Sequence, residues 1–224
     1  EIAADTGITV DLLVVGTGQA ITLAEAGDVD AVLVHAKAAE EAAVAGGNLT
    51  HRREIMYNDF VIVGPAGDPA GVADDASAVE AMTDIANAAV PFVSRGDDSG
   101  THKAELALWS KAGITPAGDW YRSVGQGMGA ALNTAAGMDA YILSDRASWL
   151  NFENKGDLAL LYAGDPAMFN QYSYLPVNAD LHPSVRADLA AQLEDWLTGD
   201  KAKGLIDGYR VAGEQVFTFN AQPM

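Results

Sequence analysis

The chain has 224 residues, and 31 acidic side chains against 13 Lys and Arg give it a formal net charge of −18. A hydrophobic share of 49% with 20% charged residues excludes an intrinsically disordered chain. Because the few Lys and Arg are scattered along the sequence, we expect no nucleic acid among the partners. The lack of cysteine excludes disulfides, thiol catalysis and thiolate metal sites.

In chain order, the first elements alternate between strand and helix patterns. Residues 8–15 are rich in β-branched side chains and predict a strand. A helix is expected at 19–26, a short apolar strand at 31–34, and a helix at 36–45 that ends at Gly46. This order predicts an α/β fold with right-handed parallel crossovers.

Two long extended segments, at residues 54–64 and 171–177, bracket a middle part with its own alternation. The elements expected there and after it are a helix at 77–88, a strand at 92–93, a helix at 99–111, a glycine-led helix at 125–136, strands at 140–143 and 158–162, and a final helix from Ser184. A chain that leaves one α/β lobe and later returns to it gives this pattern. We therefore predict two lobes, residues 1–62 with 175–224 and residues 63–174.

Residues 94–101, SRGDDSGT, carry the strongest signal for a ligand site. A strand ends here and a helix begins at about Ser99, so unpaired N–H groups and a positive helix end are available. Ser99 and Thr101 add hydroxyl groups, and Arg95 adds a planar guanidinium suited to an oxyanion. These residues predict a site for a small tetrahedral or carboxylate anion. A helix cap at Asp98 or Ser99 with Arg95 paired to Asp97 is the structural alternative.

Two further strand-to-helix turns are rich in glycine. Thr17 and Gly18 follow the first predicted strand, but Ile21 stands where a dinucleotide loop needs its third glycine, so we expect no nucleotide. Gln126 and Gly127 lie in the turn GQGMG at 125–129. Packing explains each turn by itself, whereas three in one chain favour an anion cleft between lobes.

Catalytic and metal sites have weaker support. Asp98-Ser99-Gly100 resembles the nucleophile loop of a serine protease, but Thr101 replaces the expected glycine and His102 lies on the same helical turn. The four histidines lack metal-ligand spacing. We therefore expect no enzyme, no metal and no cofactor.

Several strings resemble the periplasmic tungstate-binding proteins of bacterial ABC importers. In chain order they are VGTGQA at 15–20, GDVDAVLVH at 27–35, REIMYNDFVIVGP at 53–65, FVSRGDDSGT at 92–101, WYR at 120–122 and WLT at 196–198. The resemblance implies a type II periplasmic-binding-protein fold, with two lobes, each a mostly parallel sheet flanked by helices. Two hinge strands would coincide with the extended segments. It assigns anion contacts to Arg95 and Thr101, and more weakly to Ser94 and Ser99.

The resemblance also implies partners and a location. It predicts a tungstate or molybdate oxyanion as ligand, an ABC transporter permease as partner, a monomer, and a periplasmic protein whose signal peptide is absent from this chain. Such proteins normally begin with a strand and a Thr/Ser-rich turn that binds the anion from the first lobe. This chain is expected to start after that point, at the end of the first helix, either because the segment was removed or because it was never part of the chain. A ligand-sensing domain of a LysR-like regulator and a receptor for another small anion are the alternatives.

Overall fold

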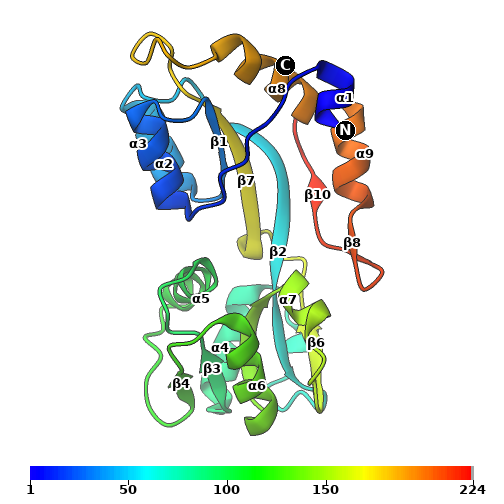
Figure 1. Cartoon of the computed structure of the whole chain (residues 1–224). Coiled ribbons are helices and arrows are strands. Elements are labelled where there is room, and N and C mark those ends of the chain that lie inside the picture. The colour runs from blue at the N-terminus through cyan, green and yellow to red at the C-terminus, as the bar shows by residue number, and fades with distance from the viewer. Residues whose placement is uncertain (223–224) are drawn as a thin grey trace. The chain divides into compact units, whose positions relative to one another are not determined.

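The computed structural model describes residues 1–222, and the chain forms two compact units. Unit 1 consists of Glu1–Tyr57, Asn170–Tyr209 and the C-terminal segment from Phe217. Unit 2 consists of Asn58–Phe169 and Arg210–Val216. The chain thus leaves unit 1, builds most of unit 2 and returns (Figure 1).

Unit 1 combines elements from both ends of the chain. They are α1 (Ile2–Thr6), α2 (Thr17–Ala26), β1 (Ala31–Val34), α3 (Lys37–Ala45), the start of β2 (Arg53–Pro65), β7 (Phe169–Pro176), α8 (Ala187–Leu197), α9 (Asp200–Gly208) and β10 (Thr218–Phe219). β1 pairs antiparallel with β7, and α2 and α3 lie side by side next to β1 (Figure 1). Their apolar faces meet around Ala24, Val32 and Leu175, which are almost fully buried.

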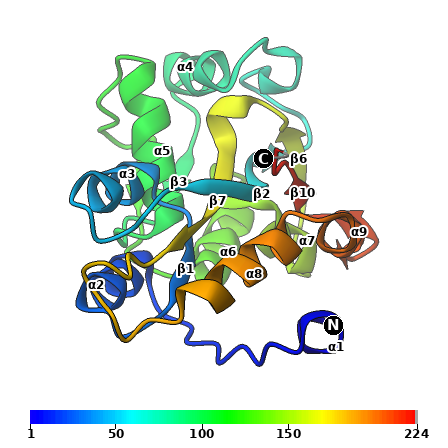
Figure 2. The same cartoon turned by 90° about the horizontal axis from the view of Figure 1, so that it is seen from above.

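The strand predicted at residues 8–15 is wrong. These residues link α1 to α2 as an irregular segment, visible in Figure 2 as a thin trace. Leu12 and Val14 are 81% and 83% exposed. β-branched residues favour a strand only where a neighbouring strand supplies hydrogen bonds and a packing surface. Within the described residues, no strand pairs with this segment.

Unit 2 holds the rest of β2 and the elements of the middle part. They are the 3₁₀ turn η1 (Val72–Asp74), α4 (Ala78–Ala88), β3 (Phe92–Ser94), α5 (Gly100–Lys111), β4 (Tyr121–Ser123), α6 (Met128–Met138), β5 (Tyr141–Asp145), α7 (Arg146–Asn151), β6 (Leu158–Tyr162), η2 (Pro166–Met168), β8 (Arg210–Val211) and β9 (Glu214–Gln215). β3 lies between β4 and β5 and is parallel to both. Phe92 and Trp109 pack edge to face beside it, with a ring-centroid distance of 5.2 Å.

The α/β prediction is confirmed, but the sheets are less parallel than predicted. β2 is antiparallel to β5 and β6, as β1 is to β7. Parallel neighbours need a long crossover, usually a helix, between them. In unit 2, α5 joins β3 to β4 and α6 joins β4 to β5, so these three strands are the ones that pair in parallel.

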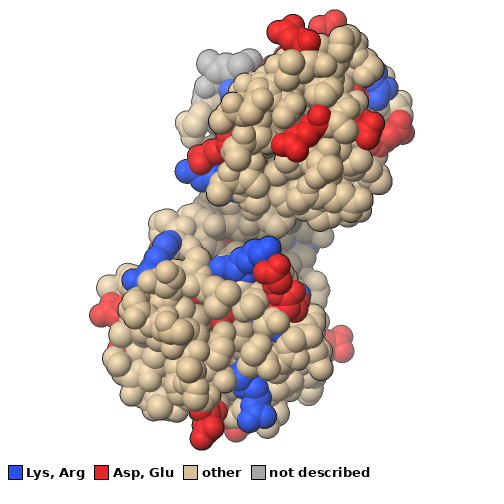
Figure 3. Space-filling view, turned by 90° about the vertical axis from the view of Figure 1, so that its left-hand side faces the viewer, with Lys and Arg blue, Asp and Glu red and all other residues tan. Residues whose placement is uncertain are grey.

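The surface carries the acidic excess of the chain. On the face shown in Figure 3, Asp and Glu lie singly or in small groups on each unit, with Lys and Arg side chains among them. None of the described helices is both long enough and apolar enough to cross a membrane.

Candidate anion site

The strongest site predicted from sequence lies at the carboxyl ends of two parallel strands of unit 2. Ser94 at the end of β3 pairs with Ser123 at the end of β4. The loops that follow stay side by side, because Val124 N donates to Ser94 O at 3.0 Å and Gln126 N donates to Arg95 O at 3.1 Å. Helices α5 and α6 begin directly after these loops. The fold therefore brings two helix N-termini to one edge of the sheet.

Gly96 makes the close approach of the two loops possible. Its φ is +60°, a conformation that side-chain-bearing residues rarely adopt. A Cβ at this position would lie 1.7 Å from Ser123 Oγ and 3.1 Å from Ser123 Cβ. Glycine is therefore required both by the backbone conformation and by the neighbouring strand end.

Arg95 is held in place by two neighbours on its own loop. Nη2 donates to Asp97 Oδ2 at 2.5 Å, and Nη1 lies 3.5 Å from Thr101 Oγ1. Asp97 also accepts from Ser99 N at 3.2 Å. Partial burial opposes ionisation of Asp97, but the hydrogen bonds from Ser99 and Arg95 outweigh it and lower its pKa to about 2. The ion pair of the structural alternative is thus present, and it orients the guanidinium.

Two buried polar atoms of this site have no protein partner within the usual hydrogen-bond distance. They are Nε of Arg95 and Oγ of Ser94, and Ser94 is fully buried. A buried donor without a hydrogen bond costs about 1–3 kcal/mol, so native structures seldom retain one without a reason. Thr101, with 7% of its surface exposed, adds a second hydroxyl beside Arg95. These atoms are suited to a ligand that accepts hydrogen bonds.

The other residues predicted to bind the anion are divided between unit 2 and unit 1. Ser99 caps α5, and its Oγ accepts from His102 N at 3.3 Å. Gln126 and Gly127 are exposed and belong to the second loop, with Gly127 as the N-cap of α6. Thr17 and Gly18 form the first turn of α2 in unit 1. The structure brings Ser94, Arg95, Ser99, Thr101, Gln126 and Gly127 together in unit 2, and the contribution of the unit 1 pair stays a prediction.

Sequence reasoning missed Glu105. It lies four residues after Thr101, on the same face of α5, and is 2% exposed. Its Oε1 accepts from Trp109 Nε1 at 3.1 Å and from Tyr121 Oη at 2.7 Å. Burial raises the pKa of this carboxyl, against the opposing effect of the hydrogen bonds. Its spacing from Thr101 was the one signal that could have linked it to the site.

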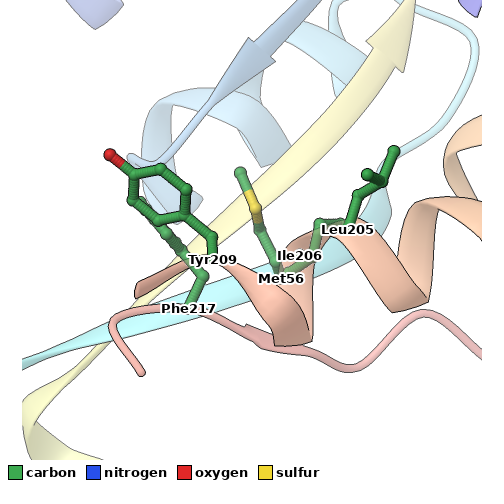
Figure 4. A pocket seen from close by; sticks show the side chains of 5 residues that line it. All are labelled: Met56, Leu205, Ile206, Tyr209 and Phe217. Carbon is green, nitrogen blue, oxygen red and sulfur yellow. The ribbon is translucent and has the colours of Figure 1, made fainter. Parts of the chain in front are cut away.

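A different cavity, of about 250 Å³, lies within unit 1 and has another character. It is lined by apolar and aromatic side chains, Met56, Leu205, Ile206, Tyr209 and Phe217 (Figure 4). It offers no cationic side chain among these residues, so it does not suit an anion. Among the described residues, no group of His, Asp and Glu is arranged to hold a metal ion.

Comparisons with known proteins identify the family of the chain. A family model described as a PBP superfamily domain matches residues 2–201. The tungstate-binding protein TupA of Peptoclostridium acidaminophilum is 44% identical over 99% of this chain and 79% of its own length. A putative ABC transporter anion-binding protein of Haloferax volcanii is 44% identical over 92% of this chain and 62% of its own length.

A solved structure of a tungstate-binding protein also matches the chain. The tungstate-binding protein TupA from Desulfovibrio alaskensis G20 matches with a TM-score of 0.94 and 41% identity, covering 99% of this chain and 90% of that chain. This match confirms the type II periplasmic-binding-protein fold predicted from sequence. The chain therefore belongs to the periplasmic-binding-protein superfamily and, within it, to the family of the tungstate-binding proteins.

Proposed function

We propose that this protein captures tungstate, and also accepts molybdate, as the non-catalytic solute-binding protein of an ABC importer. The observation that carries the proposal is the pair of buried, unpartnered polar atoms, Arg95 Nε and Ser94 Oγ, beside the start of α5. Relatives named as a tungstate-binding protein and as an ABC transporter anion-binding protein support it. They do not favour the alternative of a LysR-like sensing domain.

The chemistry of the site favours an anion that carries no proton. Tungstate and molybdate are dianions at neutral pH and need only donors, whereas phosphate usually carries a proton and needs an acceptor. Asp97 is engaged by Arg95 and Ser99. The Asp98 side chain is 86% exposed and lies 3.4 Å from Lys103. Neither loop carboxylate is therefore free to accept a proton from the ligand.

Binding at the start of α5 uses three kinds of interaction. The guanidinium of Arg95 supplies charge-assisted hydrogen bonds, which are about twice as strong as neutral ones. The hydroxyls of Ser94 and Thr101 supply neutral donors. The N-terminus of α5 adds about half a positive charge. Together these groups replace the water that a dianion loses.

The remaining parts of the proposal concern the whole protein. We propose that the protein has two lobes that close on the anion, residues 1–62 with 175–224 and residues 63–174. Thr17 and Gly18 contribute donors from the first lobe. The closed, monomeric protein then delivers its ligand to a permease from the periplasm. The order of the chain through the two units supports this division.

Calorimetric titration with tungstate and with molybdate tests the function. We expect saturable binding, and Arg95→Ala to weaken it by roughly 30-fold or more, because a charge-assisted hydrogen bond is worth about 2 kcal/mol or more. Lys111→Ala is the matched control, because it removes the same charge from the other end of α5. No heat with either anion, or equal loss in both variants, would contradict the proposal.

A further inference from the structure

Beneath the anion site lies a carboxyl group that the proposed function does not yet use. Glu105 and Thr101 are four residues apart on α5, and such pairs have their Cβ atoms about 5–6 Å apart. Thr101 in turn lies beside Arg95. A buried Glu is therefore placed about one helical turn below the groups that would hold a dianion. Coulomb repulsion between an ionised Glu105 and that dianion would be strong in such a poorly solvated place.

The charges around the site make the protonation state of Glu105 decisive. Arg95 and Asp97 form an ion pair and cancel each other. Asp97 keeps its negative charge throughout the neutral range, because its pKa is about 2. With Glu105 ionised, these three side chains sum to one negative charge, and with Glu105 protonated they sum to zero. The second state opposes the attraction of a dianion by the helix dipole and the hydroxyls less than the first state does.

The hydrogen bonds of Glu105 leave one route for its proton. Trp109 and Tyr121 both donate to Oε1. Ser94 is a hydrogen-bonding neighbour that lowers the pKa of Glu105, although its Oγ has no partner within the usual hydrogen-bond distance. A proton on Oε2 can be donated to Ser94 Oγ, and the Ser94 proton is then free to point to the anion. An ionised Glu105 instead attracts the Ser94 proton to itself.

We propose that Glu105 is the charge-controlling residue of the anion site: it takes up a proton from solvent when the dianion binds. This inference rests on the proposed function, because it concerns the same site. It predicts that the affinity is highest while Glu105 is protonated in the free protein. As the pH rises above that range, the affinity falls by about tenfold per pH unit until Glu105 is ionised in the complex as well.

The titratable groups on the elements packed around Glu105 decide which of them could compete with it for a proton. His102 lies on the same helix, and its Nδ1 accepts from Asp98 N at 3.1 Å. Tyr121 on β4 is bonded to Glu105 itself, and burial raises its pKa far above neutrality. From β5, Tyr141 donates to Asp68 at 2.7 Å. α4 packs against α5 and contributes apolar residues to the same core. His102 is therefore the competing proton acceptor that a test has to exclude.

The test is calorimetric titration with tungstate between about pH 6 and pH 9, in buffers with different heats of ionisation, which gives the number of protons taken up per anion. We expect wild-type protein to take up as much as one proton. Glu105→Gln keeps the size and an acceptor oxygen, so it should take up none. Its affinity should not change with pH and should exceed the wild-type affinity at high pH by about tenfold or more.

Two further variants keep the test decisive if Glu105→Gln fails to fold. Tyr121→Phe removes a hydrogen bond that stabilises the ionised carboxyl, so the loss of affinity should move to higher pH. His102→Gln should retain the proton uptake. Wild-type binding without proton uptake, or uptake that is lost in His102→Gln and kept in Glu105→Gln, would overturn the inference. Absence of any wild-type binding would instead contradict the proposed function.

Discussion

At the scale of single residues, Arg95 shows how a structural and a functional interpretation can both apply. The sequence left open whether Arg95 pairs with Asp97 or binds an anion. In the structure the two Nη atoms of the guanidinium donate hydrogen bonds to Asp97 and Thr101, while Nε is buried without a partner. The ion pair therefore restricts the guanidinium to one orientation and leaves a donor for a ligand. Orienting the group in advance reduces the entropy that binding costs.

The low pKa of Asp97 has a consequence for stability. A carboxyl whose pKa is about 2 in the folded protein and near 3.8 otherwise stabilises the fold above about pH 4. This contribution is lost as the pH falls toward 2. We expect Asp97→Asn to lower the free energy of unfolding by about 1 kcal/mol at neutral pH, a value reduced for solvent screening. Near pH 2 the variant and the wild type should converge.

Urea denaturation at several pH values provides the measurement. Asp98→Asn is the matched control, because the side chain of Asp98 is 86% exposed. This variant should leave the free energy of unfolding almost unchanged. A loss in Asp97→Asn that persists unchanged at pH values near 2 would show that the carboxylate charge does not cause it.

How well sequence predicts a residue depends on whether its role is local. Arg95, Ser99 and Thr101 lie within seven residues of one another, so their shared loop was visible in the sequence. Glu105 was missed because its significance depends on Tyr121, which comes from another strand. The unsatisfied state of Ser94 Oγ likewise depends on what packs around it, and sequence carries no such information.

At the scale of elements, the site depends on two loops that are pressed together at the ends of β3 and β4. Gly96 and Gly113 both adopt positive φ, at +60° and +69°, but a Cβ would meet Ser123 only at Gly96. Gly113→Ala should therefore cost about 1 kcal/mol of backbone strain. Gly96→Ala should cost about 1–3 kcal/mol more, because the added methyl group overpacks the loop.

Denaturant unfolding of the two glycine variants checks this expectation. The Ser123→Ala background supplies the control, because it removes the hydroxyl closest to the added Cβ. In that background the extra cost of Gly96→Ala should largely disappear. Equal destabilisation by both glycine variants in the wild-type background would contradict the close packing of the two loops.

Elements with strong patterns were predicted well, and those that depend on distant partners were not. The helices at 77–88 and 99–111 agree with α4 and α5 within one residue. The strand expected at 8–15 is wrong. β-branched residues form a strand only where a neighbouring strand pairs with them. β4 has three residues, too few for a recognisable alternation, and was not predicted.

At the scale of the whole molecule, the charge of −18 is compatible with a dianionic ligand. Exposed charges farther away than the Debye length of about 8 Å are largely screened at physiological salt. The ligand would instead respond to Arg95, to buried hydroxyls and to helix ends at short range. The global acidity therefore bears on solubility, whereas the local arrangement bears on binding.

The most direct test of the central claim is a crystal structure of the protein with tungstate, with the metal located by its anomalous scattering. We predict one strong tungsten peak, with its oxygens within hydrogen-bonding distance of Arg95 Nε and Ser94 Oγ at the start of α5. A tungsten peak away from these atoms in crystals that contain bound tungstate, or none at saturating concentration, would contradict the account.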